Sequence, residues 1–177
     1  LLPLVTDPAD RKMLHDLITI PSTLVKTIIR IAQMQLRANN HNAAHQSAGL
    51  ALEKQSAIQN SRIRDTALSE IARIYIQTND LDSAKKTAFT IEAPLLREEI
   101  FSAMLNAHLE TDNLNRAFAL ITGTPNRQFR EKLLAQAALF FSNKQNQRLA
   151  LLLCKHITDQ RLRVETITRI SGAQNVP

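Results

Sequence analysis

The sequence predicts an all-α protein made of repeated helical hairpins. Arginine recurs at a constant interval, each time after an apolar residue, at Arg64, Arg97, Arg130 and Arg163. Only three of the 177 residues are glycine, which suits closely packed helices joined by short turns. A fixed period of about 33 residues is typical of stacked helical repeats, in which each unit buries its face against its neighbours.

The same period relates other positions. Small residues coincide at Ala84, Ala117 and Ala150, and polar breaks coincide at Asn79-Asp80, Asp112-Asn113 and Gln145-Asn146. An earlier, longer copy aligns Asn39-Asn40 with Asn79-Asp80, and its extra length is expected between Glu53 and Arg62. Between the breaks the apolar residues have helical spacing, as in Leu68, Ile71 and Tyr75. Each unit is therefore predicted to be a hairpin of two helices.

Capping chemistry predicts where the helices begin and end. Asp7-Pro8 offers a cap and a first-position proline for a leading helix, and Ile20-Pro21-Ser22-Thr23 ends it. Pro94 and Gly123-Thr124-Pro125 mark exits from second helices. The expected helices span roughly 8–19, 23–38, 41–58, 64–78, 81–92, 97–111, 114–122, 129–142, 146–158 and 161–171. We expect an N-terminal segment over 1–22, a repeat array over 23–171 and a disordered tail over 172–177.

Acidic residues directly follow three of the periodic arginines, at Asp65, Glu98 and Glu131. With first helices beginning at 64, 97 and 129, these carboxylates would favour the positive end of the helix dipole. The arginines themselves fit two interpretations. They could form an anion-binding ridge, or they could pair between repeats and cap preceding carbonyl groups, and we favour the second because of the neighbouring carboxylates.

Composition excludes several classes of protein. No apolar run approaches the roughly 20 residues that span a bilayer, and the opening apolar stretch is too short for a signal core and lacks a basic flank. The first residue is not Met, which indicates a processed protein or an excised piece. A single cysteine, Cys154, allows no intrachain disulfide and is expected to be a buried structural thiol. The sequence does not identify the compartment, but it favours a soluble protein and, among compartments, the cytoplasm.

One unit has the features of a known repeat. Small residues stand at Ala72 and Ala84, with Leu68, Ile71 and Tyr75 on one side and Thr78-Asn79-Asp80-Leu81-Asp82-Ser83 on the other. This pattern resembles a tetratricopeptide repeat, most closely over 64–96 and more weakly over 23–171. The resemblance implies a right-handed α-solenoid of about four antiparallel helical hairpins plus flanking helices. It also implies a concave groove, lined by the first helices, that binds a peptide or partner helix.

Repeat register then places polar residues in the groove that the resemblance implies. They are Lys26, Arg30, Gln33, Arg37, Ser69, Arg73, Gln77 and Asn106, followed by Glu110, Lys132, Gln136 and Asn143. The first four lie on one helical face and form a cationic stripe. Glu70 is expected to be the only acid near Lys26, Arg30, Arg37 and Arg73. Such a stripe could bind an acidic peptide segment or a C-terminal carboxylate, or it could be an ordinary solvated face.

A formal net charge of +6 and a pI near 9.9 raise single-stranded RNA binding as an alternative function. The charge is not continuous, because residues 64–130 carry 8 basic and 9 acidic side chains. With no Trp, one Tyr and six Phe, the chain also has few platforms for base stacking. A protein partner is therefore the favoured prediction.

Catalysis has little support in the sequence. His41 and His45 stand four residues apart and could share a metal, but the intervening residues lack the glutamate of a zincin motif and no third ligand is evident. We expect no cofactor, no metal and no enzymatic activity. The sequence favours an interaction scaffold, such as an adaptor, a chaperone-like module or an oligomerisation segment that could also self-associate through its ends.

Overall fold

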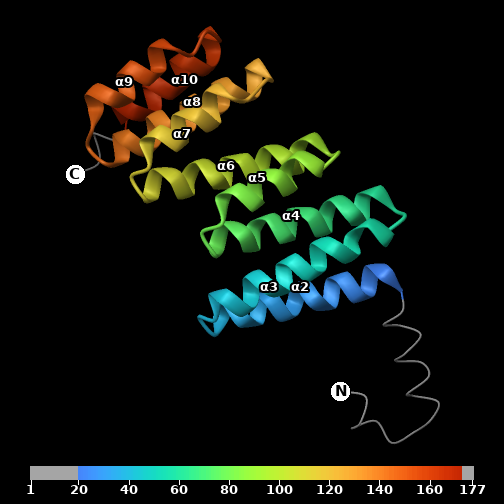
Figure 1. Ribbon diagram of the computed structural model, residues 1–177. Coiled ribbons are helices and arrows are strands. Elements are labelled where there is room, and N and C mark those ends of the chain that lie inside the picture. Colours follow the sequence, from blue (N-terminus) through green and yellow to red (C-terminus); the bar gives the residue numbers. More distant parts are fainter. Residues whose placement is uncertain (1–19, 173–177) are drawn as a thin grey trace, which may run out of the picture. The chain divides into compact units, whose positions relative to one another are not determined.

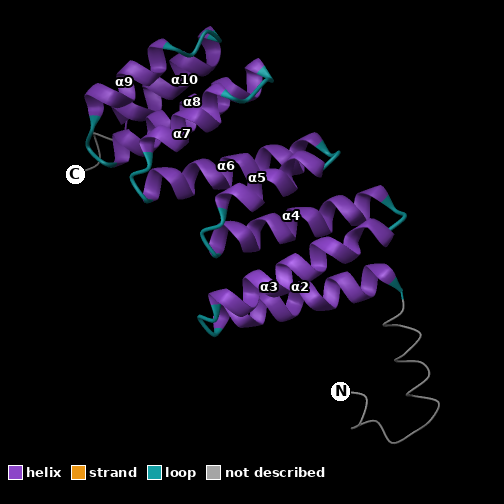
Figure 2. Cartoon of the chain, in the orientation of Figure 1, coloured by secondary structure: helices purple, strands orange, loops and turns teal. Residues whose placement is uncertain are grey.

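The computed structural model describes residues 20–172, and within that range the chain is helical without strands (Figure 1, Figure 2). The helices are Pro21–Arg37 (α2), His41–Lys54 (α3), Ser61–Gln77 (α4), Leu81–Thr90 (α5), Pro94–Glu110 (α6), Leu114–Thr122 (α7), Arg127–Asn143 (α8), Gln147–Lys155 (α9) and Gln160–Gly172 (α10). A short 3-10 helix, Gln55–Ala57 (η2), extends α3. The predicted all-α class is confirmed. The leading helix expected over 8–19 and the tail beyond Gly172 lie outside the described residues.

Long and short helices alternate along the chain. The long helices α2, α4, α6 and α8 each contain 17 residues, whereas the short helices α5, α7 and α9 contain 10, 9 and 9. Helices α4, α6, α8 and α10 begin at positions 61, 94, 127 and 160, which is the same constant interval as that of the arginines. The interval from the start of α2 at position 21 to the start of α4 is longer. The extra residues of this first unit lie at the end of α3 and in η2, which overlaps the region between Glu53 and Arg62 where the sequence placed them.

One type of turn joins each long helix to the short helix that follows. Asn39, Asn79, Asp112 and Gln145 occupy the left-handed region, with φ between 55° and 61°. The next residue then serves both helices: the Asp80 N–H donates to the Tyr75 carbonyl at 2.8 Å, while its carboxylate accepts from the Ser83 N–H at 3.0 Å. This is the Schellman ending of one helix and the N-cap of the next. All four predicted polar breaks are turns of this kind.

The second type of turn leads into a long helix. The side chains of Asn60, Asn126 and Asp159 accept the backbone N–H three residues later and so cap α4, α8 and α10. The helices begin two or three residues earlier than expected, at 61, 94 and 127 rather than 64, 97 and 129. Pro94 is correspondingly the first residue of α6 and not an exit from α5, since proline suits the first helical turn, where its missing N–H has no partner to lose.

Asp65 is therefore not a helix-start charge, as the sequence suggested, but the fifth residue of α4. It is buried, and its carboxylate accepts the backbone N–H groups of Glu92 and Ala93 at 3.1 and 2.7 Å. Glu131 in α8 does the same for the loop before α10, accepting from the Asp159 N–H at 2.7 Å and from the Thr158 hydroxyl. These two acids hold the loop that ends the following short helix.

The described chain clusters into two compact units, one ending at Ile100 and one beginning at Phe101, so that the boundary falls within α6. In the first unit α2 packs against α3, and α4 packs against α2, α3 and α5. In the second unit α8 packs against α7 and α9, and α10 packs against α8 and α9. The periodic alanines Ala84, Ala117 and Ala150 are fully buried on the short helices, where a methyl side chain allows close approach. The predicted domain limits at residues 22 and 171 remain predictions.

Candidate functional site

Two neighbouring hollows lie between α2 and α4 in the first unit. The first has a volume of about 640 Å³ and is lined by residues of α2, α4 and the start of α3: Gln33, Leu36, Arg37, His41, Glu70, Arg73, Ile74 and Gln77. Four of these residues, Gln33, Arg37, Arg73 and Gln77, were predicted from the sequence to line a groove. The structure therefore brings four of the twelve predicted groove residues to one place.

The second hollow has a volume of about 600 Å³ and a more apolar lining. Its residues are Ser22, Thr23, Lys26, Ile29, Ile58, Arg62, Ile63, Thr66, Ala67 and Glu70. Lys26 was predicted, and Glu70 lines both hollows. We refer to the two hollows together as the α2–α4 groove.

Basic side chains outnumber acidic ones in the α2–α4 groove. Lys26, Arg37, Arg62 and Arg73 line it, against Glu70 alone. The expectation that Glu70 is the only nearby acid is wrong, however, because Arg73 forms an ion pair with Glu99 of α6 at 2.8 Å. Both partners are about half exposed, so water screens this pair. The groove remains cationic through Lys26, Arg37 and Arg62.

Three other predicted residues do not line the groove. Ser69 is buried, and its hydroxyl donates to the Thr66 carbonyl at 2.8 Å, so it belongs to the interior of the unit. Arg30 is exposed on α2 but lines neither hollow. Asn106 lies in the second unit, where its amide oxygen accepts from Gln136 at 2.6 Å, and the same Gln136 amide donates to the Ser102 carbonyl. Asn106 and Gln136 thus connect α6 with α8.

Several groove residues were missed from the sequence. Arg62 and Ile63 were assigned to the loop before the helix, because the expected start at 64 overlooked Asn60 as a capping residue. That signal was available, since Asn is a preferred N-cap. Leu36 and Ile74 carried no signal, because an apolar side chain at helical spacing is indistinguishable from a core residue until the neighbouring helix is placed.

His41 and His45 have different surroundings in the structure. His41 lines the first hollow, whereas the His45 Nε2 lies 2.8 Å from an Asp80 carboxylate oxygen and its ring meets the Tyr75 ring edge-on at 5.2 Å. No cluster of three His, Cys, Asp or Glu residues suited to a metal ion occurs within residues 20–172. Burial, together with the charges of Asp80 and Glu53, raises the pKa of Tyr75.

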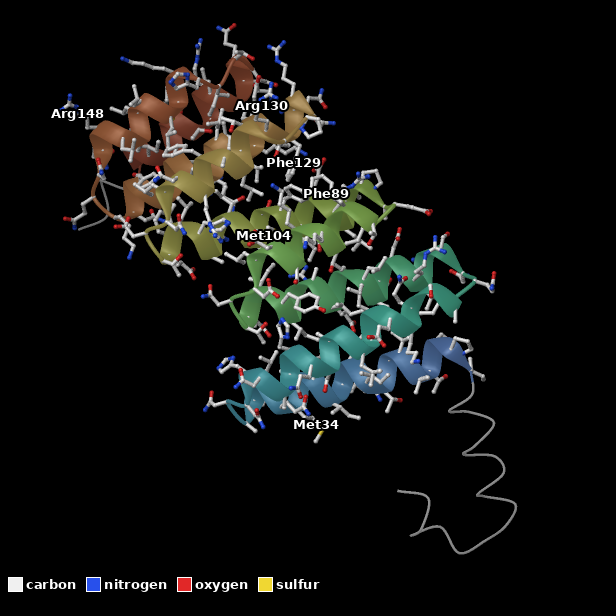
Figure 3. All side chains as sticks on the ribbon, in the orientation of Figure 1. Met34, Phe89, Met104, Phe129, Arg130 and Arg148 are labelled. Carbon is white, nitrogen blue, oxygen red and sulfur yellow. The ribbon has the colours of Figure 1, made fainter. Side chains whose placement is uncertain are left out.

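Three of the four periodic arginines contact the loops between helix pairs. Arg64 pairs with Glu92 at 2.9 Å, and Arg130, labelled in Figure 3, donates to the Thr124 carbonyl at 3.0 Å. Arg97 reaches the Glu92 carbonyl at a long 3.5 Å. These are the pairing and carbonyl-capping contacts expected of a structural role.

The second unit contains a hollow of about 570 Å³ with balanced charge. Three basic and three acidic side chains line it together with two uncharged ones: Arg127, Lys132, Arg161, Glu131, Asp159, Glu165, Gln128 and Leu162. Hydrogen bonds from Thr158 and Asp159 hold the pKa of Glu131 at about 2, with Arg127 acting in the same direction and burial opposing them. Glu131 therefore stays charged, and its contacts serve the loop that it holds rather than a ligand.

Cys154 in α9 is buried, as the sequence predicted, and burial raises the pKa of its thiol, which disfavours the reactive thiolate. Across residues 20–172, no helix is both long and apolar enough to cross a membrane. Comparison with protein families, with curated proteins and with solved structures found no match in any of the three. The groove must therefore be interpreted from its own chemistry.

Proposed function

We propose that this chain is a non-catalytic interaction module that binds an acidic peptide segment of another protein in the α2–α4 groove. The observation that carries the proposal is the charge of the groove. Lys26, Arg37 and Arg62 line two adjoining hollows and make no ion pair with another described residue. Unpaired cations around a concave surface favour carboxylate ligands, which form charge-assisted hydrogen bonds with them.

The proposed architecture is a right-handed, tetratricopeptide-like α-solenoid. Support comes from the constant spacing of helix starts, from the recurring turn chemistry, and from the packing of α4 on the preceding α2 and α3. In this arrangement the long helices present their exposed polar faces to the partner, while the short helices support them. The groove between α2 and α4 is the part of that surface where the described structure offers both depth and unpaired charge.

The length of the groove defines the size of the ligand. Lys26 and Arg37 are separated by eleven residues of one helix, which corresponds to about 16 Å at 1.5 Å per residue. An extended peptide covers that distance with about five residues. Carboxylates near the two ends of such a segment would reach Lys26 and Arg37, and Arg62 would lie beside the first of them.

Charge reversal tests the proposal. The Arg37→Glu and Arg62→Glu double variant should bind a fluorescein-labelled glutamate-rich peptide at least about 30-fold more weakly, because two charge-assisted contacts become repulsive. Fluorescence polarisation at physiological salt measures this. The matched control reverses Arg148 and Lys155, two exposed cations of α9, and should leave affinity unchanged. Figure 3 shows Arg148 pointing outward from α9.

Two results would contradict the proposal. One is equal affinity of both double variants, with circular dichroism showing that both are folded. The other is an equal loss in both, which would mean that the peptide responds to net charge and not to the groove. Comparing the affinities of the peptide with a free C-terminus and with an amidated C-terminus would show whether a terminal carboxylate contributes to binding.

A further inference from the structure

The outer face of α2 carries an apolar stripe that the described residues leave open. Thr27, Ile31 and Met34 follow one another at helical spacing, with Ile31 45% and Met34 66% exposed. Figure 3 shows Met34 pointing away from α3 and α4. This stripe is next to the cationic residues of α2 but is separate from the α2–α4 groove, since none of its three residues lines either hollow.

The same register positions are covered in the other long helices. The offset between the first two units maps the stripe onto Ala67, Ile71 and Ile74 of α4, all of which are buried. In α8 the equivalent residues Leu133 and Ala137 are fully buried, and the third, Phe140, is partly buried. Helix α4 packs against α2 and α3, which precede it in the sequence, and against α5, which follows it, whereas α2 already packs against the following helix α3. By analogy, the exposed apolar face of α2 is where a helix preceding α2 in the sequence would pack.

The residues directly before α2 include apolar side chains that could pack on this face. Buried isoleucines lie three residues before the start of α4, α6 and α10, at Ile58, Ile91 and Ile157. The residue at this position before α2 is Ile18. Leu14 and Leu17 complete an apolar group with it, and the expected helix over 8–19 is comparable in length to α5, α7 and α9. Residues 8–19 lie outside the described residues, so this step rests on their sequence.

Charge also favours these residues over a second copy of α2. Helix α2 contains Lys26, Arg30 and Arg37 and no acid, so two copies placed face to face would repel. Residues 8–19 include Asp10 and Asp16 together with Arg11 and Lys12, so their formal charge is zero and they would not repel α2. From these observations we infer that the Thr27–Ile31–Met34 stripe is a docking surface for residues 8–19 of the same chain.

The α3–α4 pair predicts which residues would meet. His45 of α3 contacts Tyr75 of α4. Asn60, the residue immediately before α4, lies midway between them in the sequence, so residues equally distant from Asn60 face each other in this pair. The same relation about position 20, immediately before α2, places Ala9 opposite Ile31 and Asp10 opposite Arg30. Arg30, which lines neither hollow, thereby gains an acidic neighbour.

Disulfide trapping in the full chain tests this docking. In a Cys154→Ala background, Ala9→Cys combined with Ile31→Cys should form an intramolecular disulfide about tenfold faster than Ala9→Cys combined with Lys86→Cys on α5, because docking raises the effective concentration of the pair. The rate should not depend on protein concentration. Peptide mapping by mass spectrometry after oxidation identifies the linkage.

A second variant tests the same face without cysteines. Ile31→Gln should lower the urea midpoint of the full chain if residues 8–19 cover the position, whereas an open position would leave the midpoint unchanged or raise it. Equal trapping rates for the two cysteine pairs, disulfide-linked dimers through Ile31→Cys, or an unchanged midpoint for Ile31→Gln would each overturn the inference. None of these measurements involves the acidic peptide, so the proposed function stands or falls separately.

Discussion

Individual carboxylates show how a side chain can act far from its own place in the sequence. Asp65 accepts two backbone N–H groups from Glu92 and Ala93, 27 and 28 residues further on, and Glu131 holds the loop at Thr158 and Asp159 in the same way. A buried acid of this kind is stable because its hydrogen bonds replace water. Each carboxylate therefore hydrogen-bonds the loop that leads from its own helix pair to the next and holds it in place.

Removing one of these carboxylates should lower the stability of the fold. We expect Asp65→Ala to lower the free energy of unfolding by about 1–3 kcal/mol, because two partly buried N–H groups lose their acceptor. Glu53→Ala, a change of the same chemistry at an exposed position of α3, should stay within about 0.5 kcal/mol of wild type. Urea denaturation compares the two variants. Equal midpoints would show that the loop does not depend on Asp65.

Acid titration should reveal both charged groups with lowered pKa values. Burial acts to raise the pKa of Asp80, but hydrogen bonds from His45 and Ser83 outweigh it and hold the pKa at about 2, compared with 3.8 ordinarily. The pKa of Glu131 falls from 4.5 to about 2 for similar reasons. A lowered pKa in the folded state contributes stability above the ordinary value, and this contribution disappears as the pH falls through the folded value.

The stability of the wild-type protein should therefore decrease as the pH falls from about 4.5 to about 2. The Asp80→Asn and Glu131→Gln double variant should be less stable at neutral pH and should lose less stability across this window. Thermal melts at a series of pH values measure the difference, with Glu53→Gln as the control. Parallel pH profiles for the wild type and the double variant would contradict the assignment.

Helices are connected here by turns that rarely use glycine. Four left-handed positions hold Asn39, Asn79, Asp112 and Gln145. Asn and Asp tolerate this backbone region because their short side chains bond locally, whereas a longer side chain such as Gln does so less well. The turn before α9 is consequently the one whose residue type fits its backbone least.

Glycine at that turn should stabilise the protein. We expect Gln145→Gly to raise the free energy of unfolding by about 0.5–1 kcal/mol, since glycine adopts a positive φ without steric cost. Asn39→Gly, the same change at a position already occupied by Asn, should produce a smaller gain. Denaturation midpoints test both. A lower midpoint for Gln145→Gly would mean that the Gln145 side chain contributes more than its backbone strain costs.

Close packing of the short helices depends on their alanines. Ala84 is fully buried on α5, which packs against α4. We expect Ala84→Leu to destabilise by about 1–3 kcal/mol through overpacking, and Ala117→Leu on α7 to behave similarly. Lys86→Leu, also on α5 but at an exposed position, is the matched control and should be close to neutral. If both alanine variants had the wild-type denaturation midpoint, the helices could not be closely packed at these alanines.

Across the whole molecule, the charge distribution separates the two candidate partners. The net charge of +6 is spread unevenly along the chain, and three cations that make no ion pair with another described residue, Lys26, Arg37 and Arg62, line the α2–α4 groove of the first unit. Binding of a nucleic-acid phosphate backbone is favoured by a continuous track of basic residues, whereas a short acidic peptide needs only a local cluster of them.

Single-stranded RNA should accordingly bind only weakly. We expect affinity to fall steeply between low and physiological salt, with no preference among sequences. A filter-binding series with a mixed-sequence RNA oligonucleotide at several salt concentrations, run beside the acidic peptide, measures this. Sub-micromolar RNA binding that persists at physiological salt would reverse the choice of partner.

Local chemistry determined much of this structure from the sequence alone. The repeat period, the buried alanines at Ala84, Ala117 and Ala150, and the four turns between long and short helices were all predictable. These turns depend on capping residues a few positions away, so their signals are short-range. Helix starts were misplaced where the capping role of residues such as Asn60 was overlooked, and where Pro94 was taken for a helix exit instead of the first residue of α6.

Long-range packing decided the rest. Nothing in the sequence near Asp65 indicates that its partners lie at Glu92 and Ala93, and nothing near Arg73 indicates the ion pair with Glu99. Helical periodicity specifies which residues share a face, but the rotation of each face relative to neighbouring helices depends on packing. That rotation buries Ser69, leaves Arg30 outside the groove and brings Arg62 into it.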